Sequence, residues 1–414
     1  MRILIISQYY WPENFRINDV AKLLVNNGIE VSVLTGYPNY PSGVLFEGYK
    51  KYAHAIETHP DGYLVYRVPL ALRGKASSFR LVLNYLSFII NGIIFGSRLL
   101  AGVKFDLIFV YAPSPILQAI VGIYLKYSRK VPLITWVQDL WPDSIKFTGH
   151  IKNNAALSII SKIVSWIYDS NDLLLAQSKS FIKAIKDKSN SVEIIYFPTP
   201  GEHQTSVSLA SNMPEFFLDP GFNVVFAGNL GSVQSLPMIL DAAEILMGHP
   251  NIRIILVGSG SLSQWLASEV ESRNLKNVLL AGRYPAEAMP AIYERASALL
   301  VSLNRDPVLN QTVPAKLQSY LAAGKPIIAS LDGEGAHIVV QAKAGLVCAT
   351  EDPVALANAV LRLSAMSHDQ LEGLGAAGRR YFAQNFEPQA LVRELIGIFS
   401  ETISRKLDEG DHAK

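Results

Sequence analysis

Cysteine is almost absent from this sequence, since Cys348 is the only one among its 414 residues. A single thiol excludes a disulfide within the chain and a metal site made of several cysteines, and it is typical of a reducing compartment. Charge is also sparse, because only 17% of the residues are charged and the net charge is +2. With 37 basic against 35 acidic residues, the composition gives no reason to expect nucleic acid as a partner.

Several catalytic motifs are missing too. The sequence has no GxGxxG fingerprint, no Walker A sequence, no HExxH and no GxSxG elbow. It also lacks an Asp-x-Asp pair, on which many nucleotide-sugar enzymes hold a divalent metal beside the diphosphate. If the chain binds such an anion, Lys, Arg and backbone amides are therefore expected to neutralise it, with no metal site.

Long apolar runs are rare. The N-terminal MRILIISQYYWPE has a short run that leads into a polar loop, as expected for a first strand rather than a signal peptide. Residues 81–102 approach membrane-spanning length, but Asn84, Asn91 and Arg98 interrupt them, so we expect no transmembrane helix. This stretch is expected to be either a helix buried on a sheet or a bilayer-facing patch. The basic residues that favour a patch are Arg73, Lys75, Arg80, Arg98 and Lys104.

Short apolar runs alternate with helical patterns along most of the chain, which predicts an α/β fold with doubly wound parallel sheets. The expected strands of the first half are residues 3–6, 31–34, 63–68, 107–111, 133–137, 173–176 and 194–197. Residues 198–221 are rich in Pro, Ser and Gly and break the pattern, as a linker does. The expected strands of the second half are residues 224–227, 254–257, 278–281, 299–302, 327–330 and 346–348.

This pattern divides the chain into segments 1–205, 206–388 and 389–414. The first two are each expected to form a Rossmann-like domain, and the last to be a helix that crosses back to the first domain. We expect the two sheets to face a central cleft, with ligands beyond the carboxyl ends of the strands. The loops that follow strands are therefore the informative ones.

The clearest local signal is LNQTVPAKLQSYLAAGKPIIAS, which is typical of a loop, a helix, a turn and a buried strand in succession. Pro314 suits the first helical turn, Thr312 can cap it and Gly324 ends the helix. Free backbone amides near Ala315 and Lys316, with the charge of the lysine, favour an anion at the helix N-terminus. The alternative is an ordinary strand-linking helix with a solvated lysine.

Glycine and polar residues follow other strands of the second half. Gly-rich turns let a backbone approach a ligand closely, although such turns follow many strands. The candidates are Gly228, Asn229, Gly231, Gln234, Gly258 and Ser259. Arg283 is expected either to bind phosphate or flank a base, or to form a surface salt bridge. Glu334 and His337 follow the strand after the capped helix, and a lone histidine there is more often packed or solvated than functional.

The first half contributes two loops. Trp11, Glu13, Asn14 and Arg16 follow the first strand, where aromatic rings suit sugar faces and polar groups suit hydroxyls; a packed loop is the alternative. In WVQDLWPDSI two carboxylates lie four residues apart, which suits acid–base work or turn capping. We favour Asp139 as functional because it directly follows a strand, and its neighbour Asp143 as a cap.

Five stretches are specific when taken together: ILIISQYYWPENFRINDVA, WVQDLWPDSI, FAGNLGSVQSLPMILDAA, TVPAKLQSYLAAGKPIIAS and DGEGAHIVVQAKAGLV. On these the chain resembles, over essentially its whole length, the retaining GT-B glycosyltransferases of the large family 4. In particular it resembles bacterial transferases of O-antigen and colanic acid assembly, including the N-acetyl-L-fucosamine type. The resemblance implies a GT-B fold, sugar transfer with retention, and no cofactor.

The resemblance also implies roles for residues. A nucleotide-diphosphate-sugar donor, UDP-linked, is implied in the C-terminal domain and the acceptor in the N-terminal domain. Asp139 and Lys316 are implied to be catalytic. The implied donor residues are Asn14, Gly228, Asn229, Gly231, Gln234, Gly258, Ser259, Arg283, Thr312, Pro314, Ala315 and Glu334, and the implied acceptor residues are Trp11, Glu13 and Arg16.

This sequence departs from the family pattern at four positions. Two glutamates that many members carry eight positions apart are Gln311 and Ser319 here, and a common Arg and Lys are Asn229 and Gln234. Lys316 is then expected to supply the main positive charge. We interpret the changes as a trait of the O-antigen-type subgroup rather than as a loss of activity.

The implied acceptor is a polyprenyl-diphosphate-linked saccharide, which places the protein on the cytoplasmic face of a bacterial plasma membrane. Two other functions stay open. A nucleotide-sugar epimerase or hydrolase of the same fold would consume the donor without an acceptor. A non-catalytic, donor-binding partner subunit is suggested by the two missing glutamates.

Overall fold

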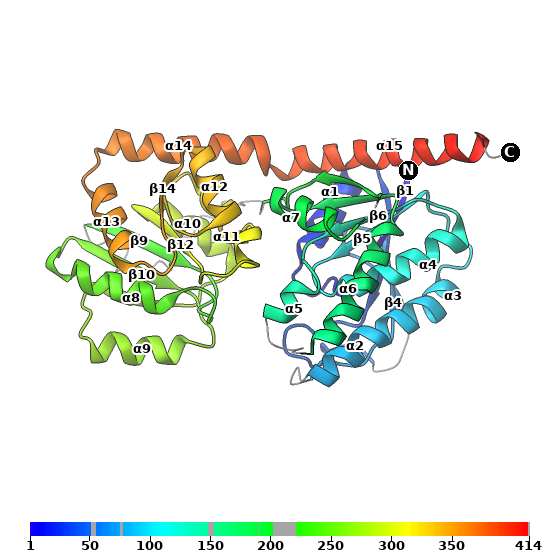
Figure 1. The fold of residues 1–414 in the computed structure, drawn as a ribbon, viewed down its shortest axis with the longest axis horizontal. Helices are drawn as coiled ribbons and strands as arrows, with labels where there is room; N and C mark the ends of the chain where they lie inside the picture. The colour runs from blue at the N-terminus through cyan, green and yellow to red at the C-terminus, as the bar shows by residue number, and fades with distance from the viewer. Residues whose placement is uncertain (51–54, 75–77, 148–152, 190, 202–220, 413–414) are drawn as a thin grey trace. The chain divides into compact units, whose positions relative to one another are not determined.

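The computed structural model describes residues 1–50, 55–74, 78–147, 153–189, 191–201 and 221–412 (Figure 1). The chain forms two compact units. Unit 1 consists of Met1–Pro200 and Pro388–Lys414, and unit 2 of Gly201–Glu387. The expected boundary at 205/206 lies outside the described residues, and the division near 388 lies within one residue of the expected one.

Unit 1 contains an eight-stranded sheet in which every neighbouring pair is parallel except β3 and β4. Its strands, in spatial order, are β3 (Ala55–Thr58), β4 (Leu64–Val68), β2 (Glu30–Gly36), β1 (Arg2–Ile6), β5 (Leu107–Ala112), β6 (Leu133–Val137), β7 (Leu173–Ala176) and β8 (Glu193–Tyr196). The strand order reverses direction at β1, which pairs with both β2 and β5. Loops after β1 and β5 therefore diverge there, where open α/β sheets bind ligands.

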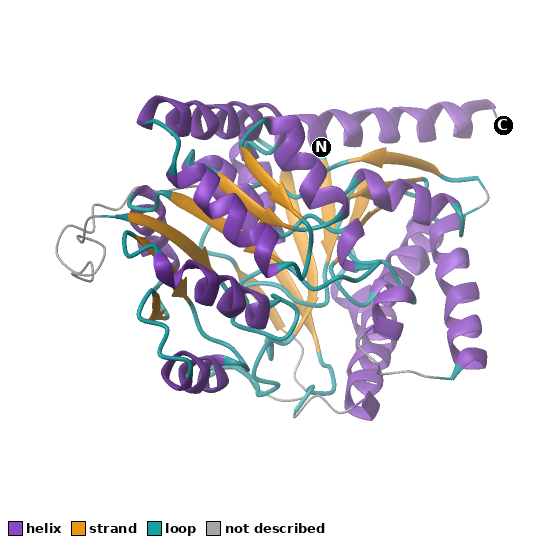
Figure 2. Cartoon of the chain, turned by 60° about the vertical axis from the view of Figure 1, so that its left-hand side comes forward, coloured by secondary structure: helices purple, strands orange, loops and turns teal. Residues whose placement is uncertain are grey.

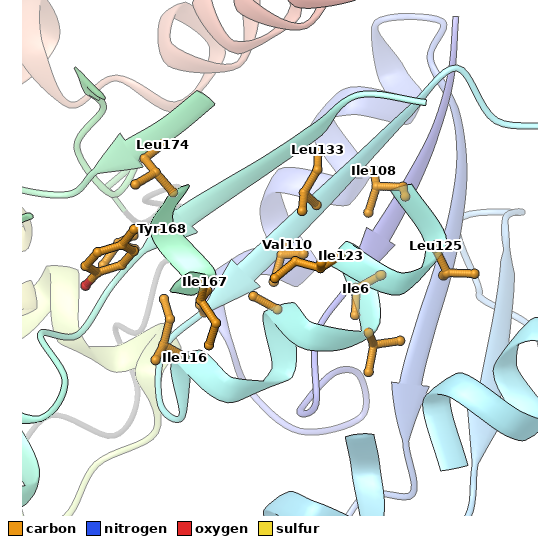
Figure 3. Packing of buried hydrophobic residues seen from close by; sticks show 14 of the residues in the cluster. Ile6, Ile108, Val110, Ile116, Ile123, Leu125, Leu133, Ile167, Tyr168 and Leu174 are labelled. Atoms are coloured by element: carbon orange, nitrogen blue, oxygen red, sulfur yellow. The ribbon is translucent and has the colours of Figure 1, made fainter. Parts of the chain in front are cut away.

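Helices cover both faces of this sheet. One face carries α2 (Ser78–Asn91), η1 (Gly92–Gly96), α3 (Ser97–Leu99), η2 (Ile116–Gln118), α4 (Ala119–Arg129) and α6 (Asn154–Asp169). Figure 3 shows the core between sheet and helices, where Ile6, Val110 and Leu133 of the strands meet Ile123 of α4 and Ile167 of α6. Two short helices, α5 (Asp143–Phe147) and α7 (Lys179–Lys186), follow β6 and β7.

The other face of the sheet is covered by α1 (Arg16–Asn26) and the C-terminal α15 (Pro388–His412). Leu395 and Phe399 of α15 are buried, and the ring of Phe399 lies edge-on to Phe109 of β5 at 5.1 Å. The expected return of the C-terminal helix to the first domain is therefore seen in the packing of α15.

Unit 2 contains a six-stranded parallel sheet, coloured green to orange in Figure 1. Its strands, in spatial order, are β11 (Val278–Gly282), β10 (Ile252–Val257), β9 (Phe222–Ala227), β12 (Ala298–Ser302), β13 (Ile327–Ser330) and β14 (Gly345–Cys348). The direction of the strand order reverses at β9, which pairs with β10 and β12. A ligand site is expected beyond the carboxyl end of β9.

The helices of unit 2 also lie on two faces of its sheet, and Figure 2 shows them in purple beside the orange strands. One core includes residues of α8 (Leu236–Ile245), η4 (Leu246–Gly248), α9 (Ser263–Ser272) and α13 (Pro353–Ser364). The other includes η5 (Ala286–Ala288), α10 (Met289–Glu294), α11 (Ala315–Ala323) and α12 (Gly333–Ala342). The 3₁₀ helix η6 is Leu309–Gln311, and α14 (His368–Asn385) begins with a capping box of Ser367 and Gln370.

Every expected strand is present, within two residues at each end, and one strand was missed. The missed β3 has the sequence AIET and pairs antiparallel at the sheet edge. Such a short, half-exposed run carries little hydrophobic signal. The helix of Phe79–Leu99 is long and apolar enough to cross a membrane by length and composition, whereas we expected no such helix; 33% of its most apolar window is buried in unit 1.

Candidate functional site

Lys316 is the central residue of the site in unit 2. Pro314 is the N-cap of α11, so Lys316 is in the first helical turn, where backbone amides have no helical acceptor. Its Nζ donates a hydrogen bond to Oε1 of Gln234 at 2.7 Å and lies 3.7 Å from the ring centroid of Phe226. The ring and the amide thus hold the ammonium group at the end of β9.

The packing of α11 fixes the position of this lysine. One turn further along the helix, the hydroxyl of Tyr320 accepts from the Ala227 amide at 2.9 Å and donates to the Ala227 carbonyl. Leu317 and Leu321 are fully buried on the same side of α11. The helix ends at Gly324, whose φ of +66° is the left-handed cap expected there.

Burial strongly affects the charge of Lys316. Desolvation lowers the pKa of Lys316 from 10.5 to about 7. Among the residues that the structure describes, no carboxylate forms an ion pair with it. An anion that binds here would therefore favour the protonated lysine and would find no internal competitor.

Glycines let the loops after β9 and β10 pack on each other. A Cβ on Gly258 would lie 1.8 Å from the Gly228 carbonyl oxygen, and one on Gly260 would lie 2.4 Å from the Leu230 carbonyl oxygen. Backbone hydrogen bonds join the two loops. The Leu230 amide donates to the Ser259 carbonyl at 3.1 Å, and the Leu262 amide donates to the Leu230 carbonyl at 3.0 Å. Gly258 and Gly260 are thus required by the fold, and the chain needs no ligand to explain them.

Gly228 borders the lysine directly. Its φ is +140°, and a Cβ there would lie 3.3 Å from Nζ of Lys316. Gly228 and Asn229 are exposed, whereas Gly231 is buried and its Cβ would collide with the Asn229 side chain at 2.6 Å. Gly228 and Asn229 are therefore the exposed residues at this point of the loop, and Gly228 is the one that borders the ammonium group.

Gln234 is held by residues of the next strand. The Ser302 hydroxyl donates to the Gln234 carbonyl oxygen at 2.7 Å, and the Asn304 side chain accepts from the Ser235 amide at 2.9 Å. Sequence analysis missed Ser302 and Asn304. Their position at the end of β12 (Ser302) and just after it (Asn304) was the available signal, because the carboxyl ends of neighbouring parallel strands share one edge.

The N-terminus of α12 lies against the start of α11. A Cβ on Gly335 would lie 3.2 Å from Pro314 Cδ, and one on Gly333 would lie 2.0 Å from the Asn310 carbonyl oxygen. Glu334, in the first turn of α12, is only 8% exposed. His337 is exposed on the same helix.

Four other candidates of unit 2 are Ser259, Arg283, Thr312 and Ala315. Ser259 and Arg283 are exposed after β10 and β11. The expected Thr312 cap is wrong, because α11 starts two residues later than such a cap requires, and the Thr312 hydroxyl donates to the Leu309 carbonyl at 2.9 Å. Ala315, the first residue of α11, is exposed.

In unit 1, Asp139 lies beyond the end of β6. Its Oδ2 accepts hydrogen bonds from Nε1 of Trp141 at 3.2 Å and from the Ser144 hydroxyl at 3.0 Å. Burial raises the pKa of Asp139, although these donors favour the ionised form. Asp143 lies in the first turn of α5 and accepts from Lys188 Nζ at 2.6 Å. The two carboxylates thus differ, because Asp139 is held by neutral donors and its pKa is raised by burial, whereas Asp143 is bound to a lysine.

The loop after β1 is packed around Glu13. This buried carboxylate accepts from the backbone amides of Tyr10, Asn39 and Tyr40 at 3.1, 2.7 and 2.6 Å. Burial raises the pKa of Glu13, while the three amides oppose that shift. We expected Glu13 to contact the acceptor, but its oxygens instead accept from the loops after β1 and β2 and join them.

The other candidates of this loop differ in exposure. Asn14 is exposed, and Arg16 pairs with Asp19 within α1 at 2.8 Å. Trp11 is partly buried, with its ring 4.9 Å from His59 and 6.0 Å from the Arg67 guanidinium carbon. Of the four, Asn14 is exposed, Trp11 and Arg16 are partly buried, and Glu13 is buried.

Arg67 was missed by sequence analysis. It is fully buried at β4 and donates to the carbonyls of Gly36 at 3.0 Å and Trp11 at 2.6 Å, and to Glu57 at 2.9 Å. Arg67 thereby joins the loop after β1 to the end of β2. A lone arginine in an apolar strand was the only signal in the sequence.

The described residues contain no group of three or more His, Cys, Asp or Glu side chains arranged to hold a metal ion.

Solved structures of similar fold were found over nearly the whole chain. Sucrose-phosphate synthase from Thermosynechococcus elongatus has 18% identity and a TM-score of 0.72, covering 98% of this chain and 99% of that chain. HepE from Anabaena, solved in complex with UDP, has 14% identity and a TM-score of 0.70, covering 97% of this chain and 100% of that chain. Two doubly wound units of this kind define the GT-B fold.

The sequence comparisons give the family. Residues 221–366 match the family described as glycosyl transferases group 1. The probable glycosyltransferase WbjE of Pseudomonas aeruginosa is 24% identical over 326 residues, 75% of this chain and 79% of the relative. The putative colanic acid biosynthesis glycosyl transferase WcaI of Escherichia coli K12 is 23% identical over 338 residues, 78% of this chain and 82% of the relative. The chain therefore contains a group 1 glycosyltransferase domain in unit 2, and the protein is a glycosyltransferase.

Proposed function

We propose that the protein transfers a sugar, an N-acetylated or deoxy hexose, from a UDP-sugar to a polyprenyl-diphosphate-linked saccharide. The reaction retains the anomeric configuration and serves the assembly of O-antigen, capsule or exopolysaccharide. It takes place at the cytoplasmic face of the bacterial plasma membrane. The observation that carries this proposal is the desolvated Lys316 beside Gly228. Both lie at the carboxyl end of β9, where the strand order in the sheet of unit 2 reverses.

A UDP-linked donor fits the groups around Lys316. A diphosphate needs positive potential, which the lysine and the free amides at the start of α11 supply. Gly228, which is exposed and has no side chain, leaves room for close approach beside the lysine. HepE, which shares this fold, was solved with UDP.

The name of one relative supports a saccharide acceptor, and the lipid-diphosphate carrier is part of the proposal. WcaI is named for the biosynthesis of colanic acid, a polysaccharide. In unit 1 we assign Asp139 a catalytic role and Trp11 a contact with acceptor sugar, because both lie beyond strand ends and neither is fully enclosed.

Departure of the diphosphate is the difficult step, because negative charge accumulates on it. Lys316 and the α11 amides stabilise that charge, and a metal is not required in this proposal. The leaving phosphate itself helps to deprotonate the acceptor hydroxyl on the same face of the sugar, which retains configuration without a protein nucleophile.

The test is UDP release from a panel of UDP-sugars, with and without a lipid-diphosphate-linked N-acetylhexosamine, in buffer with and without EDTA. We expect release that needs one donor and the acceptor together, and that EDTA leaves unchanged. Release without acceptor would instead show an epimerase or hydrolase. Donor binding without release across the panel would show a non-catalytic partner subunit.

A further inference from the structure

The helix α2 of unit 1 is apolar on its outer side as well as on its inner side, where Leu81 and Phe88 are buried. Its large apolar side chains that point to solvent follow helical spacing and continue into η1: Phe79, Val82, Leu83, Leu86, Ile90 and Ile94. Monomeric soluble proteins rarely expose a continuous row of this kind. A covering partner is therefore expected.

Three polar residues of α2, Asn84, Ser87 and Asn91, bond to the domain, whereas Arg80 is exposed. Nδ2 of Asn84 donates to the Ala71 carbonyl at 2.6 Å, and Nδ2 of Asn91 donates to the Pro69 carbonyl at 2.7 Å. Ser87 accepts from the Ala71 amide at 2.8 Å. A helix fixed to its own domain along its length cannot cross a bilayer, but its outer side can lie in the plane of one.

Two neighbouring helices extend this surface. The helix α4 contacts both η1 and α6, and Figure 1 shows α2, α4 and α6 gathered on one side of unit 1. Tyr124 and Tyr127 of α4 and Ile159, Ile163 and Trp166 of α6 are exposed. We call the exposed apolar side chains of α2, η1, α4 and α6 the outer apolar face.

The charges around the outer apolar face are positive. The exposed basic residues are Arg80, Arg98, Lys104, Lys130 and Lys162, and none of them forms an ion pair with a described residue. Acidic residues are absent from α2 through α3 and from α4, and α6 has only Asp169 at its end. Tryptophan, tyrosine and basic side chains around an aliphatic centre match the interface of an anionic bilayer.

A second copy of this chain fits the face less well. Two-fold pairing brings the same patch of both copies together, so the unpaired basic residues would approach each other. Anionic lipid headgroups neutralise them instead.

We propose that the outer apolar face docks unit 1 in the plane of an anionic lipid bilayer. The helix α2 also contacts the two loops of unit 1 that hold the candidate residues. Tyr85 of α2 lies edge-on to Trp141 at 6.0 Å, and Trp141 donates to Asp139. Asn84 accepts from Gln8 at 2.6 Å and from Tyr9 at 3.1 Å, in the loop after β1. The docking thus brings the loops that we assign to a lipid-linked acceptor to the membrane, and its role rests on the proposed function.

The test is flotation of the full chain with vesicles of phosphatidylcholine alone or mixed with phosphatidylglycerol. We expect flotation with the mixed vesicles, and a drop of about tenfold or more in partitioning for the double variant Leu86→Ser/Ile90→Ser, whose side chains are 46% and 54% exposed. The variant Arg98→Gln/Lys162→Gln is expected to lose about fivefold per charge on anionic vesicles.

The matched control is Val340→Ser/Val354→Ser in unit 2, where the side chains are 62% and 56% exposed. It is expected to float as the unchanged protein does. Equal flotation of the Leu86/Ile90 variant and this control, or no flotation at all, would overturn the proposal. Self-association that the Leu86/Ile90 variant abolishes, without vesicle binding, would overturn it in favour of an interface between copies.

UDP release separates this proposal from the proposed function. With a water-soluble, short-chain acceptor analogue, the Leu86/Ile90 variant is expected to keep its turnover, and with the same acceptor in vesicles to lose it. Release with the soluble acceptor but no flotation refutes the membrane surface alone. Flotation without release from any donor refutes the transferase alone.

Discussion

Replacing Lys316 with methionine should separate the requirements of catalysis from those of folding. Methionine is unbranched and one atom shorter than lysine, so it keeps most of the apolar stem but removes the ammonium group that lies over Phe226 and borders Gly228. A unit charge about 4 Å from a phosphate oxygen is worth roughly 4 kcal/mol at an effective dielectric constant of about 20. Loss of one such group lowers turnover by about 10²–10³-fold in comparable sites.

The same replacement should not destabilise unit 2. The fold lowers the pKa of Lys316 from 10.5 to about 7, so the charged lysine opposes folding below pH 7. That shift is worth on the order of 5 kcal/mol, partly offset in the variant by the lost hydrogen bond to Gln234. Because the folded pKa is the lower one, the stability of the unchanged protein rises between about pH 7 and 10.5.

Two measurements check this reasoning. Melting curves should show Lys316→Met at least as stable as the unchanged protein at pH 7, with a gap that closes toward pH 10. Calorimetry with a UDP-sugar and no acceptor should show proton uptake on binding, and an affinity that falls as pH rises above 7. A variant that is strongly destabilised at pH 7, or that turns over normally, would refute the role given to this lysine.

Three further predictions concern the framework of the two units. Gly258→Ala should lower the melting temperature of unit 2 strongly, since its Cβ would lie 1.8 Å from the Gly228 carbonyl oxygen, whereas Gly248→Ala, with nothing within 4 Å, should not. Arg67→Met should destabilise unit 1 by about 3–5 kcal/mol in urea unfolding, because it leaves buried partners unpaired; a loss below 1 kcal/mol would contradict its joining role. Asp139→Asn should lower turnover by about 10²-fold or more with a melting temperature within a few degrees of the unchanged protein; equal turnover would remove Asp139 from the catalytic residues.

The sequence determined the architecture of this protein nearly completely. Parallel strands buried on both faces are continuous apolar runs, such as ILII and LITWV, and these stand out against the helical pattern around them. The Gly-rich turns and the helix start at Pro314 were visible for the same reason, because backbone geometry restricts which residues fit there.

Only the tertiary structure decided which polar residues face a ligand and which hold the framework. Glu13 and Lys316 look alike in the sequence: Glu13 is in the loop after a strand, and Lys316 is in the first turn of a helix that follows such a loop. Three backbone amides from two loops surround Glu13, whereas Lys316 meets a ring, one amide oxygen and no carboxylate among the described residues. These partners are distant in the sequence, so no local pattern encodes them. The same holds for α2, where only packing shows that Asn84 faces the domain and Leu86 faces solvent.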